Sequence, residues 1–266
     1  MADIRSKLNT LYSLEQVSAG NTPIHHVHPM AKLAVTGIYL FCIVSFGRYS
    51  VARLSPYLFY PVLVMALADI PWSMILKRAV VALPFCLFAG ITNVIFDRTP
   101  AFAFGAVTVS AGMVSLWVLL LRTLLCVSAV LILVAVTPFS HLTDELRRLS
   151  VPELLVALLE MIYRYISVLG EEAASMVTAF RLRGNGEKWP APRQFGPFVG
   201  QLLLRSADRA ERVYQAMQCR CYALRDVKKG RKPWSRADWV FLLLGGGTSV
   251  LFRFFDFTLF LERWMT

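Results

Sequence analysis

Apolar residues gather along the chain in five long runs separated by polar stretches. The runs cover residues 33–47, 54–70, 79–96, 113–136 and about 239–260. An α-helix rises about 1.5 Å per residue, so about 20 apolar residues cross roughly 30 Å of hydrocarbon. The fourth run is long enough by itself, whereas the first is short and Pro84 interrupts the third. We therefore predict an all-α, polytopic membrane protein with about five transmembrane helices, within a range of four to six crossings.

The segment 137–236 has a different pattern, in which apolar residues recur with helical period beside charged ones. A first amphipathic helix is expected to start at a capping box formed by Ser150 and Glu153 and to run to Gly184. A loop rich in proline and glycine follows, with Gly186, Pro190, Pro192, Gly196 and Pro197. A second helix then presents an apolar face made of Val199, Leu202, Leu203, Ala210, Val213 and Met217. Its opposite face carries Arg205, Asp208, Arg209, Glu211 and Arg212.

These patterns divide the chain into four parts. Residues 1–30 form a polar N-terminal segment, 31–136 hold the first four transmembrane helices, 137–236 form a helical region outside the bilayer, and 237–266 hold the last transmembrane helix. The start lacks the features of a cleaved signal peptide. Residues 139–236 contain 17 of the 28 basic and 10 of the 17 acidic residues, a net charge of +7. The positive-inside rule places this region and the N-terminus in the cytoplasm and the C-terminus outside.

Composition changes the picture mainly by exclusion. The chain is 56% hydrophobic and 17% charged, which rules out an ordinary soluble monomer. The net charge of +11 fits a lipid surface or an acidic protein partner better than a nucleic acid. Three of the five cysteines lie in apolar runs, and Cys219 and Cys221 form a Cys-x-Cys pair, so no disulfide framework is expected.

Both amphipathic helices are expected to end near an arginine. The first end reads Arg181, Leu182, Arg183 and Gly184, and the second reads Met217, Gln218, Cys219, Arg220 and Cys221. An arginine in the last turn favours the negative end of the helix dipole, and its planar fork can bind a partner's carboxylate bidentately. On chemistry alone, these are either docking residues or ordinary solvated charges.

The two helix ends resemble the transmembrane (T) component of energy-coupling factor (ECF) transporters, a family that carries an Ala-Arg-Gly tripeptide at the end of each of two cytoplasmic helices. The amino-acid sequence of residues 205–220 is similar to that of the cobalt-type member, CbiQ. Pro152–Leu155, Tyr163–Tyr165 with Arg164, and Glu171–Glu172 match its first coupling region, and His28–Lys32 stand where it has a motif before its first span.

The resemblance implies a non-catalytic subunit of an ATP-driven importer in a prokaryotic inner membrane. It implies that Leu182, Arg183, Gly184, Cys219, Arg220 and Cys221 dock onto two ABC-type ATPase subunits, with Arg181, Met217 and Arg164 in support. ATP and Mg would be bound by those partners and no cofactor by this chain. A membrane substrate-binding subunit would capture the cargo, with room for a further small membrane subunit. The preferred cargo is cobalt, with nickel or a vitamin as alternatives.

The sequence departs from the family pattern at the second tripeptide, where Cys221 replaces the glycine. This loss argues against an obligatory left-handed cap at that end. His28 and Met30 replace a usual acid and base, which removes the ordinary partners for an ion pair there.

Several other residues have competing interpretations. His25, His26 and His28 are weak candidates for a metal site, and with His141 they would be needed by the alternative function, a membrane-embedded metal-dependent enzyme. An ion channel or secondary carrier is a third possibility, but the chain shows no internal repeat. Arg122, in the fourth run, must face protein, water or a carboxylate, either within the chain or on the substrate-binding subunit. Arg205, well before the helix end, is expected to be a dispensable surface charge.

Overall fold

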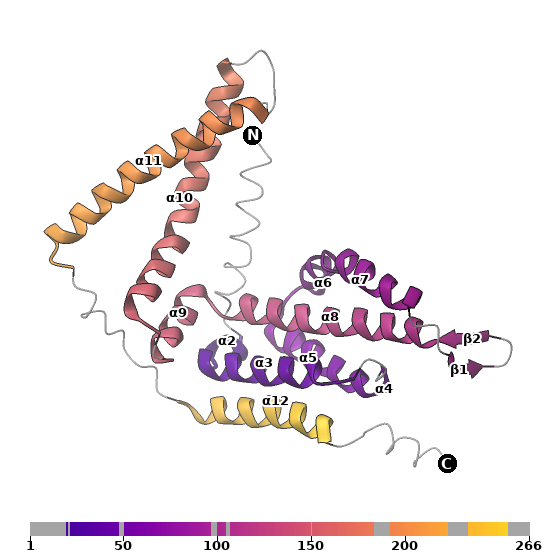
Figure 1. The fold of residues 1–266 in the computed structure, drawn as a ribbon. Helices are drawn as coiled ribbons and strands as arrows, with labels where there is room; N and C mark the ends of the chain where they lie inside the picture. The colour runs from indigo at the N-terminus through magenta and orange to yellow at the C-terminus, as the bar shows by residue number, and fades with distance from the viewer. Residues whose placement is uncertain are drawn as a thin grey trace. The chain divides into compact units, whose positions relative to one another are not determined.

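A computed structural model describes residues 20, 22–47, 51–96, 100–104, 107–149, 151–183, 192–222 and 234–254. The chain forms two compact units. The first, here the membrane unit, comprises Gln16–Pro138 and Lys232–Thr266, and the second, here the hairpin unit, comprises Met1–Glu15 and Phe139–Arg231. Figure 1 gives the position of each helix in the chain.

The membrane unit contains the apolar runs. Its elements are α2 (Pro23–His26), α3 (Pro29–Val44), α4 (Val51–Leu54), the 3-10 helix η1 (Ser55–Leu58), α5 (Phe59–Ala68), α6 (Trp72–Val80), α7 (Leu83–Phe96), α8 (Ala111–Val136) and α12 (Arg236–Phe254). By length and apolar composition α8 and α12 can each span a membrane, and α6 with α7, bent by 46°, can form a third span. Pro29–Val44 and Ser55–Ala68 are shorter apolar helices. The all-α polytopic class is confirmed, and the count of five crossings stays a prediction.

Two local features differ from the expected elements. The second apolar run is divided into α4, η1 and α5, because Pro56 lacks the N–H that a continuous helix would need at that position. The second feature lies between the third and fourth apolar runs, where no element was predicted. It is an antiparallel hairpin of β1 (Pro100–Phe104) and β2 (Val107–Ser110), with a register irregularity between Pro100 and Phe102.

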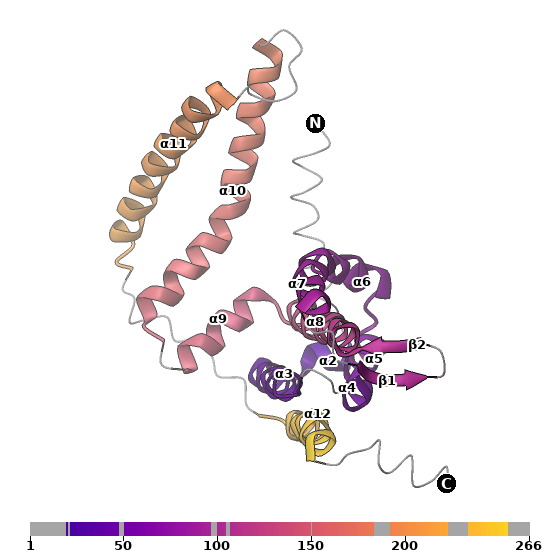
Figure 2. The same cartoon turned by 45° about the vertical axis from the view of Figure 1, so that its right-hand side comes forward.

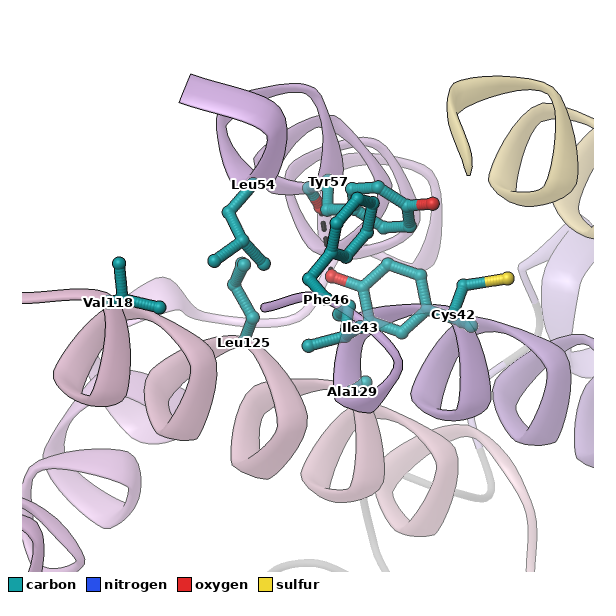
Figure 3. Packing of buried hydrophobic residues seen from close by; sticks show 9 residues of the cluster. Cys42, Ile43, Phe46, Leu54, Tyr57, Val118, Leu125 and Ala129 are labelled. Carbon is teal, nitrogen blue, oxygen red and sulfur yellow. Dashed lines mark hydrogen bonds between the residues drawn. The ribbon is translucent and has the colours of Figure 1, made fainter. Parts of the chain in front are cut away.

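The core of the membrane unit lies where α3, η1 and α8 meet (Figure 3). Tyr39 and Tyr57 are almost fully buried there, and the Tyr39 hydroxyl donates to the Tyr57 carbonyl at 2.9 Å. The last described helix, α12, packs along α3. A Cβ at Gly245 would lie 2.7 Å from Val35 Cγ1, so only glycine allows these two helices to approach so closely.

The hairpin unit contains α9 (Phe139–Arg148), α10 (Glu153–Arg183) and α11 (Pro192–Cys219). As expected, the first long helix continues past Gly170 to Arg183. The Pro152 carbonyl accepts from Leu155 and Val156, while Ser150, the expected cap, lies outside the described residues. Figure 2 shows α10 and α11 as two long rods.

The proline-rich loop expected before the second helix was predicted too long. Pro192, Gly196 and Pro197 all belong to α11. Proline fits the first helical position, where its missing N–H has no intrahelical acceptor, and Pro197 is only slightly beyond the first turn. The helix therefore starts about two turns earlier than the pattern of apolar residues indicates.

Candidate functional site

The hairpin unit presents its two helix-end arginines at opposite ends of an antiparallel helix pair. Leu154, at the start of α10, lines the same groove as Met217 and Tyr222 at the end of α11. Farther along, Arg205 of α11 forms an ion pair with Glu172 of α10. Since α11 has 28 residues, about 40 Å of helix separates its first residue from its C-terminal arginine. The two motifs thus form two separate sites.

The end of α11 is a Schellman cap. The Tyr222 N–H donates to the Met217 carbonyl at 3.0 Å, and the Cys221 N–H donates to the Gln218 carbonyl at 3.0 Å. Cys221 has a φ of 52°, in the left-handed region. The left-handed cap, which the loss of the glycine made non-obligatory, nevertheless forms here: Cys221 adopts the conformation that the family's glycine would favour, because the two capping hydrogen bonds require it.

This cap fixes the position of Arg220 at the helix end. Arg220 and its neighbours Cys219 and Cys221 are exposed. The guanidinium of Arg220 makes no hydrogen bond or ion pair with any residue in the described part of the chain. Tyr222 and Met217 line the adjacent apolar groove, and Met217 supports the cap through the carbonyl that accepts from the Tyr222 N–H.

The end of α10 also carries an exposed arginine, as the end of α11 does. Arg183 is the last helical residue and is exposed, and Leu182 is 84% exposed. Like Arg220, the Arg183 side chain is not bonded to any described residue, whereas Arg181 does have a partner. Gly184 lies outside the described residues.

Arg164 and Glu160 of α10 do not make the contacts that the sequence favours. Arg164 is exposed and lies 19 residues before Arg183, roughly 28 Å along the helix, so the structure does not bring these two residues together. Glu160 lies one turn before Arg164, a spacing that favours an ion pair between them. Its carboxylate instead accepts from Arg147 Nη2 and Thr143 Oγ1 of α9, each at 3.1 Å, and Phe139 stacks on Tyr163 beside them at 4.1 Å.

Arg205 is likewise not a simple solvated charge. Its ion pair with Glu172 joins α10 to α11, and the two side chains are 50% and 27% exposed. Arg209, expected on the polar face, is half-buried and lines the groove, while Leu203, expected on the apolar face, is 67% exposed. The inward stripe of α11 is therefore rotated relative to the predicted one. It comprises Leu202, Ser206, Arg209, Val213 and Met217.

The groove between α10 and α11 has a volume of about 780 Å³ and mainly apolar walls. Leu158, Met161, Ile162, Tyr165 and Ile166 of α10 form one wall. Ile162 is 57% exposed and Leu158 49% exposed. An open apolar surface of this kind is typical of a place where another protein or a membrane packs.

The histidines of the N-terminal segment have structural contacts. His25 Nδ1 lies 2.6 Å from Thr22 Oγ1, His26 is exposed, and His28 Nδ1 accepts from the Met30 N–H at 3.2 Å, which caps α3. Within the described ranges, no group of three His, Cys, Asp or Glu side chains is arranged to hold a metal ion.

Arg122 binds within its own chain. Its Nη2 donates to the carbonyls of Phe46 and Gly47, just beyond the C-terminus of α3. Arg253 of α12 donates to the neighbouring Ser45 carbonyl and hydroxyl and lies 4.7 Å from the Phe46 ring centroid. These contacts support the intrachain reading of Arg122 over a bond to another subunit.

Sequence reasoning missed Asp238, which lies 2% exposed at the start of α12 and accepts from the His28 N–H of α3 at 2.7 Å. Its position just before an apolar run was the one local signal. The partner is 210 residues away, so no spacing pattern could have indicated it.

The family model of CbiQ, described as cobalt transport protein, matches residues 20–230. The putative fused cobalt transport protein CbiMQ of Methanocorpusculum labreanum is 27% identical over 224 residues, which are 84% of this chain and 35% of that relative. The chain thus spans about a third of the fused protein.

Two further relatives cover different shares. The energy-coupling factor transporter transmembrane protein EcfT of Ruminiclostridium cellulolyticum is 25% identical over 227 residues, covering 79% of this chain and 83% of the relative. The cobalt transport protein CbiQ of Rhodobacter capsulatus is 36% identical over 89 residues, 33% of this chain and 36% of the relative.

Proposed function

The chain belongs to the CbiQ family of cobalt transport proteins, and we propose that it is the T component of an ECF importer, coupling two ATPase subunits to a membrane substrate-binding subunit. The observation that carries this proposal is the pair of exposed arginines, Arg183 and Arg220, each at the C-terminal end of a long helix. In the described part of the chain, neither guanidinium has a bonded partner.

Each arginine docks into an acidic groove on one ATPase subunit. A guanidinium binds a carboxylate with two parallel hydrogen bonds, so it transmits orientation as well as attraction. The Schellman cap holds Arg220 on the last turn of α11, and a rigid helix of 28 residues extends behind it. A displacement of the ATPase subunits therefore moves whole helices. Two separate docking sites match two ATPase subunits.

The substrate-binding subunit contacts the groove between α10 and α11. Its occupant is an apolar helical surface, because the walls offer mainly aliphatic and aromatic side chains. Rotation of α10 against α11 changes the width of this groove. Movement of the ATPases is thereby passed to the subunit that holds the cargo.

The chain itself catalyses no reaction in this proposal. ATP and Mg are bound by the ATPase subunits, and the cargo is cobalt, which the family description and two of the relatives' names support. The membrane is the inner membrane of a prokaryote, with the hairpin unit on the cytoplasmic side, as its net positive charge favours. Uptake of labelled cobalt, nickel and a vitamin by the same assembled complex separates these cargoes.

The decisive experiment removes both arginines. Arg183→Ala combined with Arg220→Ala should detach the ATPases and abolish uptake, since each unpaired partner carboxylate at a buried pair costs on the order of 2 to 5 kcal/mol. Capture of the ATPases and uptake are measured side by side. Arg212→Ala is the matched control, because Arg212 is exposed on the same helix and makes no bond to another described residue. Normal uptake in the double variant, or equal damage from the control, would refute the docking assignment.

A groove variant tests the other partner. Met161→Glu places a charge on the apolar wall and should release the substrate-binding subunit while the ATPases stay bound. Leu203→Glu, at an exposed position of α11 that does not line the groove, is its control. Release of both partners together by Met161→Glu would show that the groove does not distinguish them.

A further inference from the structure

A buried polar cluster lies at one end of the membrane unit. His28, Lys32 and Asp238 are 0%, 4% and 2% exposed, respectively, in a unit whose interior is otherwise mainly apolar. We call these three residues the clasp. Burial of an ammonium and a carboxylate is costly unless hydrogen bonds satisfy both groups. The bonds that this cluster makes therefore reveal what it holds.

The two charged members bind backbone groups of different helices. Lys32 Nζ donates to the carbonyls of Val136, at the end of α8, and His25, each at 3.2 Å. Asp238 Oδ1 accepts from the His28 N–H and Oδ2 accepts from the Ser235 N–H, each at 2.7 Å. The clasp thereby ties the start of α3 to the end of α8 and to the start of α12.

The ring of His28 completes the cluster. It stacks on Trp234 with ring centroids 5.2 Å apart and planes inclined by 24°. Trp234 in turn contacts Trp239 of α12 at 5.2 Å. These aromatic contacts keep the segment before α12 against the N-terminus of α3.

The clasp lies close in sequence to two of the three points at which the chain passes between the two units. Val136 is two residues before Pro138, where the membrane unit gives way to Phe139 of the hairpin unit. Ser235 is four residues after Arg231, where the hairpin unit ends. The described main chain runs directly from Val136 through Thr137 and Pro138 into α9, so the hairpin unit is joined to the membrane unit next to a carbonyl that the clasp holds.

We propose that Lys32 and Asp238 are positioning residues through which movement of the hairpin unit is delivered to the helices of the membrane unit. This inference rests on the proposed coupling function. An apolar contact of equal area could stabilise the same helices, but it would let them slide, whereas hydrogen bonds from fixed charges define one position. Without the clasp, the ends of α8 and α12 yield locally and the displacement is lost before it reaches α3.

The experiment uses the complete complex with its ATPases and substrate-binding subunit in liposomes. Lys32→Met keeps the length of the side chain but removes the donor, and Asp238→Asn keeps its size but removes the charge and one acceptor. Both ATP hydrolysis and cargo uptake are measured, and their ratio is the readout. Ser128→Ala is the control, because Ser128 is buried in α8 and, among the described residues, its hydroxyl bonds only within that helix, to the Leu125 carbonyl at 2.9 Å.

We expect both clasp variants to retain ATPase capture and hydrolysis while uptake per ATP falls about tenfold or more, the effect of losing a buried charge-assisted hydrogen bond. Hydrogen exchange of the His28 and Ser235 amides should accelerate in Asp238→Asn. An unchanged ratio in both variants would overturn the inference. If neither variant yields a folded complex while Ser128→Ala does, the cluster serves folding alone and the inference is also overturned.

The same experiment separates the inference from the function on which it rests. A wild-type complex in which hydrolysis does not drive uptake refutes the coupling function, and the clasp proposal falls with it. A wild-type complex that couples normally, with clasp variants that also couple normally, refutes the clasp alone.

Discussion

The two units use cations at helix C-termini in opposite ways. In the membrane unit, Lys32 binds the last carbonyl of α8, and Arg122 and Arg253 bind carbonyls at the end of α3. In the hairpin unit, Arg183 and Arg220 stand at the ends of α10 and α11, are exposed and have no bonded side-chain partner among the described residues. The chemistry is the same in both places, because a cation is favoured at the negative end of a helix.

The difference lies in which acceptors remain for the guanidinium or ammonium group. In the membrane unit, a carbonyl at a helix end has little water to bind, so an intrachain cation satisfies it and stabilises the bundle. At the end of α11, the Schellman hydrogen bonds already satisfy those carbonyls. The arginine beside them is left to bind something else. Backbone capping thus separates an arginine that stabilises the fold from one that can bind a partner.

The largest expected change in stability comes from removing a cation that binds carbonyls within the membrane unit, here called an inward cation. Arg122→Met leaves the carbonyls of Phe46 and Gly47 without a donor and should lower the free energy of unfolding by about 3 kcal/mol. Thermal unfolding in detergent measures it. Lys77→Met, at an exposed position of α6, should change it little. Wild-type stability in Arg122→Met would remove the distinction between inward and outward cations.

Removing one of the exposed helix-end arginines of the hairpin unit, the outward cations, should weaken binding of the ATPases and leave the stability of the chain unchanged. Arg220→Ala should weaken capture of the ATPases by about 2 kcal/mol, roughly 30-fold, without altering thermal unfolding. Arg220→Lys should recover little of this loss, since lysine keeps the charge but lacks the planar fork. A lower unfolding temperature in Arg220→Ala would show that this arginine stabilises the fold, as the cations of the membrane unit do.

An intermediate case is the ion pair between Glu172 and Arg205, which bridges two helices but is partly solvated. Glu172→Gln should cost less than about 1 kcal/mol of stability. A double-mutant cycle with Arg205→Met measures the coupling energy of the pair. A coupling energy several times larger than this value would show that the ion pair stabilises the fold as strongly as the buried cations of the membrane unit do.

The smallest effect is expected at the cap itself. Cys221→Gly removes the side-chain penalty at a φ of 52° and should stabilise the end of α11 by about 0.5 to 1 kcal/mol. Slower hydrogen exchange of the Cys221 position and Tyr222 amides would report it. Cys221→Ala keeps a Cβ and should give no such gain, and equal gains from both would point to the thiol as the cause.

Long, uniform elements were predictable from sequence. The fourth apolar run became α8, and the amphipathic period of residues 153–183 became α10, because a single physical signal extends over many turns in each. The motif arginines were also located correctly at helix ends. Elements that repeat one signal over many turns are therefore well specified by pattern alone.

Errors arose where one local signal competed with another or where the partner was distant. Pro192 and Pro197 indicated a loop, although proline also starts helices, and that second role prevailed. Cys221 has no sequence feature that announces a left-handed conformation, which is imposed by the hydrogen bonds of Tyr222 and Met217. The contact of Asp238 with His28 joins opposite ends of the chain and depends on how the helices pack.

The packing of α12 along α3 has a consequence for biosynthesis. Two contacts of the earlier helices cannot form until α12, the last described helix, has been made. The Tyr57 hydroxyl donates to the Ser249 carbonyl at 2.7 Å, and the Val35 side chain fits against Gly245. During synthesis, the ribosome completes the whole hairpin unit before that helix appears. The bundle therefore stays open on one side while the earlier helices insert, and a chain that stops before residue 236 would expose this uncovered face to the quality-control proteases of the cell.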